Sequence, residues 1–183
     1  MTIVIDPGHG GRDPGAVYQG YREKDQVLAI SKRIKEQLNY KGIRCTLTRE
    51  NDEFLSLLDR ADKLRSIKDA SLFVSIHFNA SASRKGTGME TYRVNRANRA
   101  ISEQSKRPQE LIHKEIAELN RKYNIRDRGM KEANFYVLRN SNKPAVLIEV
   151  LFIDNDMKLI ENTNYYFEVA TSIAFAIEKY INN

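Results

Sequence analysis

The sequence predicts one α/β domain spanning residues 1–183, with three layers: a mostly parallel twisted sheet of about six strands, and helices on both faces. In the first half, short apolar runs alternate with amphipathic segments in the order strand, helix, strand, helix, strand. Parallel neighbours need crossover connections, and helices of this length supply them. The length of 183 residues suits a single domain, and 41% hydrophobic with 30% charged residues is a globular composition.

The first half contains five predicted elements. Residues 2–6 form a β-branched run that stops at the turn-forming segment 7–11, which predicts a buried strand and a tight loop. Apolar residues at helical spacing predict helices over 24–40 and 55–67, and Gly42 is well placed to end the first. The remaining apolar runs predict strands at 43–48 and 72–79.

The second half is less regular. A strand is expected at 89–94, and the charged segment 95–123 is expected to be mostly helical, with Pro108 starting a new helix or kinking a long one. Two further strands are expected at 135–139 and 145–152, separated by a turn. Asn155 is a candidate N-cap, and the last helix is expected over about 165–181.

Composition excludes several classes of protein. No run approaches the roughly 18 apolar residues of a membrane helix, and the N-terminus has no basic segment followed by an apolar one, which predicts that this chain encodes no secretory signal. The single cysteine, Cys45, excludes a disulfide framework and a Cys-rich zinc site. The net charge of +6 is compatible with an anionic partner, such as nucleic acid, an acidic membrane or a wall polymer, and equally with a solvated basic surface that has no specific partner.

Two of the three histidines follow or end predicted strands. His9 comes directly after the first strand, and His77 interrupts the apolar alternation of the third. Ligand sites of open α/β sheets form at this edge, so the two imidazoles are expected to converge there. Catalytic zinc sites commonly add one carboxylate and leave a position open for water. Spacing leaves Asp6, Asp13 and Glu23 as alternatives for that third ligand.

Glu149 is the most unusual carboxylate, because it interrupts a run that reads as a central strand buried on both faces. A buried carboxylate normally shifts its pKa, forms an ion pair or binds metal. Glu149 has two possible roles, a structural ion pair with an arginine or a functional role at the strand edge, and the second is favoured.

The glycine-rich segment 6–15 lacks both the G-x-G-x-x-G spacing and the Walker lysine spacing of nucleotide-binding loops. Tight turns that bring the backbone close to a metal explain its glycines better.

Four segments in order along the chain carry a family resemblance: Asp6-Pro7-Gly8-His9-Gly10-Gly11, Arg22-Glu23-Lys24, Ser75-Ile76-His77-Phe78-Asn79-Ala80 and Pro144-Ala145-Val146-Leu147-Ile148-Glu149. Together they resemble the catalytic domain of zinc-dependent N-acetylmuramoyl-L-alanine amidases, which are bacterial cell-wall hydrolases. The resemblance implies that His9, Glu23 and His77 bind one Zn²⁺ per chain and that Glu149 is the catalytic carboxylate. It also implies hydrolysis of the amide between N-acetylmuramic acid and L-alanine.

The same resemblance implies where the chain acts and on what. The partner is expected to be peptidoglycan, with anionic wall polymers as further partners, no nucleic acid or membrane partner, and a monomeric chain acting at the bacterial cell wall. No wall-binding module is expected within these residues. The family usually has glycine where this chain has Leu151, which predicts a narrower cleft or a changed preference for the stem peptide.

Two other functions compete with this interpretation. Another zinc peptidase acting on stem peptides, such as a carboxypeptidase, would typically place a histidine and a glutamate three residues apart, whereas His9 and Glu23 are fourteen apart. A basic binding module without catalysis gives no reason for a buried Glu149 beside two histidines. A zinc assay separates the binding module from either hydrolase.

Overall fold

The central feature of the fold is a six-stranded sheet in the order β4-β1-β5-β8-β6-β7. The structure is a computed structural model that describes residues 1–95 and 98–182. All neighbours in the sheet are parallel except β6 and β8, which are antiparallel. The strands are β1 (Thr2–Pro7), β4 (Cys45–Leu47), β5 (Ala70–Asn79), β6 (Met89–Val94), β7 (Asp127–Ala133) and β8 (Ala145–Phe152). A separate hairpin pairs β2 (Val17–Tyr18) with β3 (Tyr21–Arg22).

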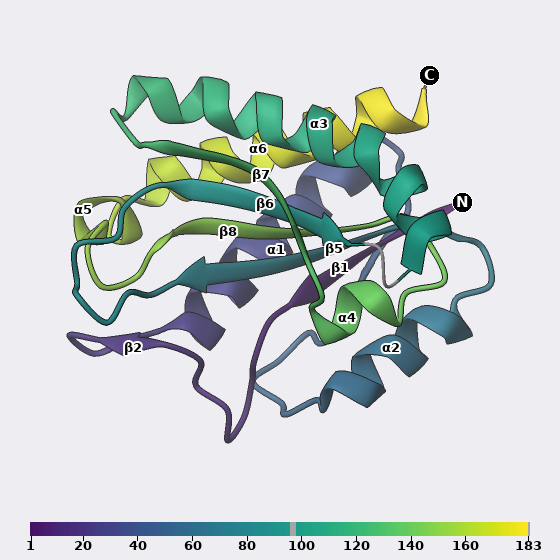
Figure 1. The fold of residues 1–183 in the computed structure, drawn as a ribbon, viewed down its shortest axis with the longest axis horizontal. Coiled ribbons are helices and arrows are strands. Elements are labelled where there is room, and N and C mark those ends of the chain that lie inside the picture. The colour runs from purple at the N-terminus through teal and green to yellow at the C-terminus, as the bar shows by residue number, and fades with distance from the viewer. Residues whose placement is uncertain (96–97, 183) are drawn as a thin grey trace.

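Helices cover both faces of the sheet, as the sequence predicts (Figure 1). One layer contains α1 (Glu23–Tyr40), α3 (Arg99–Lys122) and α6 (Thr163–Ile181), and α6 packs against the other two. The opposite layer contains α2 (Leu57–Ser66) and the short α4 (Tyr136–Arg139), which contact each other. The remaining helix is α5 (Met157–Ile160). None of the helices within residues 1–95 and 98–182 has the length and hydropathy of a membrane span.

Each central strand sends alternate side chains to two different cores. Ile3 and Ile5 of β1 join the larger core with α1, α3 and α6, whereas Val4 joins the smaller core with α2 and α4. The period of two in a strand produces this division. On the smaller face, the apolar positions give way to polar ones toward the carboxyl ends of β1, β5 and β8, and the candidate site lies there.

The structure corrects two predictions for the second half. Residues 136–139 of the predicted strand form helix α4, and the sixth strand is instead β7, at Asp127–Ala133. β7 lies at the edge of the sheet, paired with β6 alone, and its residues are exposed or half-buried. An edge strand with so little burial has no apolar alternation, so the pattern gave no signal for it.

Helix boundaries also differ from the expectations. Asn162, not Asn155, caps the last helix, and its side chain accepts hydrogen bonds from the amides of Asn164 and Tyr165. Of the two alternatives for Pro108, the structure agrees with a position inside one long helix, since the residue lies within α3 and does not start a new helix. Residues 96 and 97 of the predicted helix 95–123 lie outside the described residues.

Candidate metal centre and active site

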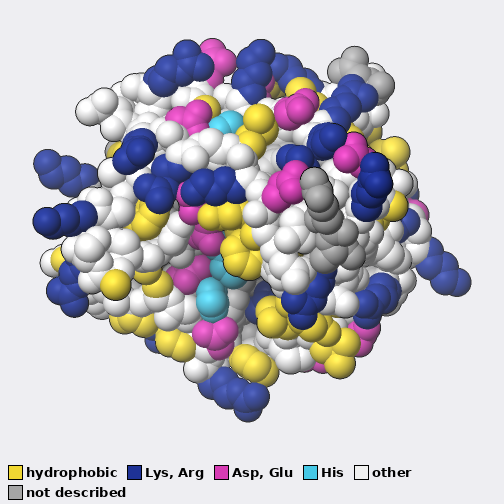
Figure 2. All heavy atoms as spheres, in the orientation of Figure 1, with side chains coloured by type: hydrophobic (Ala, Val, Ile, Leu, Met, Phe, Trp, Pro, Cys, Tyr) yellow, Lys and Arg dark blue, Asp and Glu magenta, His cyan; other side chains and the backbone are white. Residues whose placement is uncertain are grey.

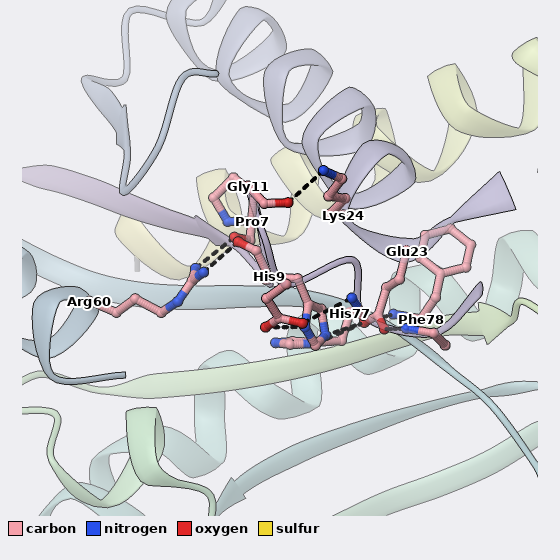
Figure 3. A network of polar contacts seen from close by, with 12 residues as sticks. Pro7, His9, Gly11, Glu23, Lys24, Arg60, His77 and Phe78 are labelled. Atoms are coloured by element: carbon pink, nitrogen blue, oxygen red, sulfur yellow. Dashed lines mark hydrogen bonds and ion pairs between the residues drawn. The ribbon is translucent and has the colours of Figure 1, made fainter. Parts of the chain in front are cut away.

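Three side chains from three elements converge at the carboxyl edge of β1 and β5. His9 lies in the loop after β1, Glu23 is the first residue of α1, and His77 is near the end of β5. Glu23 Oε1 lies 3.1 Å from His9 Nε2 and 3.0 Å from His77 Nδ1. One potential ligand atom from each residue lies within 4.8 Å of the other two. Figure 3 shows the three side chains pointing toward one another.

Two glycines allow the backbone to approach these side chains. A Cβ at position 8 would lie 2.3 Å from His77 Cε1, so any larger residue there would collide with the imidazole. Gly15 has a φ of +65°, and a Cβ there would lie 2.6 Å from a Glu23 carboxylate oxygen and 2.7 Å from the His9 ring. The glycine-rich loop therefore packs its backbone directly against the converging side chains.

Hydrogen bonds fix the orientation of His9 and Glu23. Asp13 Oδ2 lies 2.9 Å from His9 Nδ1, which leaves Nε2 directed at Glu23. Glu23 accepts hydrogen bonds from the amides of Ala16 and Phe78, at 2.9 and 3.0 Å. Burial raises the pKa of Glu23, but the two imidazoles outweigh that effect and hold the pKa well below its usual range. The carboxylate is therefore ionised.

A buried ion pair supports the loop that carries His9. Arg60 of α2 lies 2.7 Å from Asp6, and both side chains are almost fully buried. The Arg60 guanidinium also donates to the carbonyls of Pro7 and His9, at 2.7 and 2.5 Å (Figure 3). Asp6 in addition accepts hydrogen bonds from the hydroxyls of Thr48 and Ser75. Helix α2 is thereby connected to the backbone of the loop that carries His9.

Glu149 lies on β8 directly opposite His77 of β5 and Glu90 of β6. Its Oε2 atom is buried and has no hydrogen-bond partner among the described residues. Burial, together with the negative charges of Glu23 and Glu90, raises the pKa of Glu149 to about 7, although the nearby His77 opposes the shift. A carboxyl group with a pKa near neutrality can both accept and return a proton.

A cavity of about 450 Å³ opens over these residues. His9, His77 and Glu149 lie in its wall together with the charged residues Asp6, Asp13 and Arg60. The segments 54–57 and 135–137 and Leu147 form the remaining, largely apolar part of the wall. Figure 2 shows two neighbouring histidines in a hollow of the surface, with acidic side chains beside them. The cavity is large enough for a small ligand segment.

The donor set fits a zinc ion. Two imidazole nitrogens and one carboxylate are the ligands that zinc takes in catalytic sites. Ligand atoms on a tetrahedral zinc are roughly 3.4 Å apart, given metal–ligand distances of about 2.1 Å. The contacts of 3.0 and 3.1 Å from Glu23 to the two imidazoles are close to that separation. The Asp13 contact to His9 is the outer hydrogen bond that usually orients a ligating histidine.

The structure brings together His9, Glu23, His77 and Glu149, and it gives the other two candidate carboxylates different positions. Asp6 pairs with Arg60, and Asp13 bonds the far nitrogen of His9. Sequence reasoning missed Arg60, because a single arginine in an amphipathic helix looks like an exposed residue. It also missed Glu90, which is buried beside Glu149, because apolar and polar residues alternate only weakly along its strand.

The expectation that Leu151 narrows the cleft is wrong. Leu151 is fully buried within the larger core, and it is not among the residues that line the cavity. A register irregularity between β5 and β8 follows Glu149, so the residues after it do not continue the alternation of the strand. The leucine therefore fills the core and does not narrow the cleft.

Comparisons with known proteins agree with this geometry. The chain is 41% identical to the endolysin of Bacillus phage SPP1, and the match covers 98% of this chain and 66% of that protein. It is also 41% identical to the N-acetylmuramoyl-L-alanine amidase LytC of Bacillus subtilis, and this match covers 94% of this chain and 34% of that protein. It thus spans about two thirds and one third of these relatives. The solved N-acetylmuramoyl-L-alanine amidase of Clostridium difficile 630 matches with a TM-score of 0.90 and 35% identity, over 100% and 97% of the two chains. The N-acetylmuramoyl-L-alanine amidase family model matches residues 3–179, and the chain therefore belongs to this family.

Proposed function

We propose that the chain is a zinc-dependent N-acetylmuramoyl-L-alanine amidase domain that cleaves the amide between N-acetylmuramic acid and L-alanine of peptidoglycan. The observation that carries the proposal is the cluster of His9, Glu23 and His77, with Glu149 in the same cavity wall. Family membership supplies the substrate class. His9 Nε2, His77 Nδ1 and the Glu23 carboxylate would hold one zinc ion.

The residues around the cluster each have a role in the proposed reaction. When bound, a zinc ion would polarise the amide carbonyl as a Lewis acid and would lower the pKa of a bound water toward neutrality. Glu149 takes a proton from the attacking water and delivers it to the nitrogen of L-alanine as the amide bond breaks. Its raised pKa suits both steps, because the same group must be a base and then an acid near neutral pH. Asp13 and Arg60 keep His9 in position.

The proposed setting is the bacterial cell wall, where residues 1–183 act as one catalytic domain and as a monomer. The net charge of +6 suits a substrate layer rich in phosphate and carboxylate groups. Anionic wall polymers are therefore proposed as secondary, electrostatic partners.

The reaction is tested by identifying the chemical ends that appear when the protein digests purified peptidoglycan. We expect new amino groups on L-alanine and no new reducing sugar ends, because the amide and not the glycan is cut. New amino groups on residues further along the stem would instead indicate a peptidase and would contradict the proposal.

The metal assignment is tested separately by elemental analysis after dialysis. We expect one zinc per wild-type chain and none in the double variant His9→Ala, His77→Ala, because two of the three ligands are lost. The double variant His113→Ala, Cys45→Ala is the matched control, since His113 bonds Thr91 and Asp127 away from the cluster. Stoichiometric zinc in the ligand variant would overturn the assignment.

A further inference from the structure

A cationic cluster lies next to the candidate active site, on the same face of the sheet. Glu90 is almost fully buried, and its Oε2 pairs with Arg128 Nε at 2.9 Å and also with Lys131 Nζ. Its Oε1 accepts hydrogen bonds from Asn79 and from the Tyr92 hydroxyl. One carboxylate therefore holds two cations in place, and the ion cluster of Glu90, Arg128 and Lys131 carries one net positive charge.

Strand register places this ion cluster beside the proposed catalytic residues. Glu90 lies opposite Glu149, which lies opposite His77, so the three residues form one row across three neighbouring strands. Cross-strand partners share a face, and neighbouring strands are about 4.8 Å apart. The backbone of Glu90 is therefore on the order of 10 Å from that of His77.

The ion cluster lies behind the cavity wall and contacts it through Tyr92, which is itself not a lining residue. The Tyr92 ring packs edge-on against Phe135, which lines the cavity, at 5.1 Å between centroids. Lys131 Nζ lies over the Tyr92 ring, 5.8 Å from its centroid. Leu147, another cavity residue, is the cross-strand partner of Tyr92. The cavity wall and the two cations are thus joined through a single tyrosine.

The two cations keep capacity to bind an anion. The side chains of Arg128 and Lys131 are 28% and 37% exposed, whereas that of Glu90 is 3% exposed. Arg128 Nη2 has no hydrogen bond with any described residue. The guanidinium also lies 4.9 Å from the centroid of the Phe152 ring, and this contact helps to hold the Arg128 side chain in place. A preordered arginine beside a lysine is the usual arrangement for recognising a carboxylate or a phosphate.

We propose that Arg128 and Lys131, fixed by Glu90, form a subsite for the free carboxylate of the stem residue that follows L-alanine. The proposal rests on the proposed amidase function, which places the cleaved amide at the metal cluster. A carboxylate one to two residues further along an extended peptide lies roughly 7 Å from that amide. This span is about 3 Å shorter than the separation on the order of 10 Å between the backbones of His77 and Glu90, and the long side chains of Arg128 and Lys131 can bridge that difference.

The subsite is tested with two ligands that differ only at this group: N-acetylmuramoyl-L-alanyl-D-glutamate, with a free α-carboxylate, and its α-amide, N-acetylmuramoyl-L-alanyl-D-isoglutamine. Binding is measured by calorimetry in the zinc-loaded Glu149→Gln background, so that neither ligand is consumed. We expect the acid to bind on the order of tenfold more tightly than the amide, as for a hydrogen bond to a charged group.

Lys131→Met should bring this ratio close to one and leave the affinity for the amide unchanged within about twofold. Arg128 can still pair with Glu90 in this variant, so the fold is expected to persist. Lys131→Arg should restore the ratio, and Arg128→Met should lower it independently. Lys143→Met is the matched control, because Lys143 precedes β8 at the opposite end of the strand from Glu149 and should leave the ratio unchanged.

Two results would overturn the subsite: a ratio near one in the parent protein, or a tenfold ratio that survives both Lys131→Met and Arg128→Met. Inorganic phosphate serves as a third probe. If Lys131→Met abolishes phosphate binding while the dipeptide ratio is one, the cations serve a phosphate polymer and not the stem carboxylate. Wild-type cleavage of the amide ligand is followed in parallel, so failure of the amidase function is recorded separately from failure of the subsite.

Discussion

The two faces of the central sheet use the same strands for different purposes. On the face under α1, α3 and α6, apolar side chains continue along the strands, as Ile3 and Ile5 do on β1. On the face under α2 and α4, Val4 is followed in the same alternation by Asp6, and Leu147 by Glu149. The larger face buries apolar area, whereas the smaller face changes from core to candidate active site within two residues.

This difference shows how one sheet can be both stable and reactive. The larger core consists of buried hydrophobic side chains and includes none of the ionised groups of the candidate site. The smaller face must bury Asp6, Glu23 and Glu149 near one another, and each needs a partner or a shifted pKa. We therefore expect substitutions on the smaller face to change zinc binding or catalysis, and substitutions on the larger face to change stability alone.

The largest stability effect is expected for Arg60→Met. The substitution leaves Asp6 as a buried carboxylate without its cation, which should lower the free energy of unfolding by about 3–5 kcal/mol. It also releases the carbonyls of Pro7 and His9, so zinc affinity should fall. Urea denaturation and a zinc competition assay measure the two effects. The control is Arg65→Met, which removes an exposed ion pair with Asp62 on the same helix and should lower the free energy of unfolding by less than about 1 kcal/mol.

Leu151→Gly tests the opposite face. Because Leu151 is fully buried in the larger core, its loss should lower the free energy of unfolding by about 3 kcal/mol. Relative rates on different stem peptides should stay the same, since the residue does not line the cavity. The comparison of the two faces fails if Leu151→Gly keeps its stability and changes those relative rates.

Asp13→Asn is expected to weaken zinc binding by roughly 10–100-fold, the usual consequence of losing the outer partner of a ligating histidine. The fold should change little, because the Asp13 side chain is 44% exposed. A zinc titration with a competing chelator measures the effect. Asp52→Asn is a control on the same surface, since Asp52 bonds Lys24 and Gly11 but not His9. Equal zinc affinity in wild type and Asp13→Asn would contradict the positioning role.

The smallest effect is a pH dependence of stability in the zinc-free protein. The pKa of Glu149 is raised to about 7 by burial, from an ordinary value of 4.5, so the folded state holds this proton more tightly than the unfolded state does. Stability is then lost as pH rises from about 4.5 through about 7. Wild type should lose about 2–3 kcal/mol relative to Glu149→Gln between pH 5 and pH 8. Parallel stability curves would show that the carboxyl group is not desolvated.

How much of this could be predicted from the sequence differs between the two faces as well. Periodicity predicts the apolar elements, and His9, His77 and Glu149 are found as polar residues within or directly after predicted strands. The family resemblance, not spacing, chooses Glu23 over Asp6 and Asp13. Arg60 and Glu90 could not be predicted, because their partners are 54 and 59 residues away, and local patterns carry no information about such pairs. β7 escapes detection because an exposed edge strand needs no apolar alternation.

The most direct test of the account measures zinc content and hydrolysis rate together in Glu149→Gln. Three ligands complete the usual catalytic zinc set, so a fourth from Glu149 would displace the reactive water. We expect the variant to keep one zinc per chain and its fold, and to lose on the order of 10² to 10⁴ in the rate of release of L-alanine amino groups. Near-normal activity in Glu149→Gln, or loss of its zinc, would contradict the assignment of Glu149 as the catalytic base.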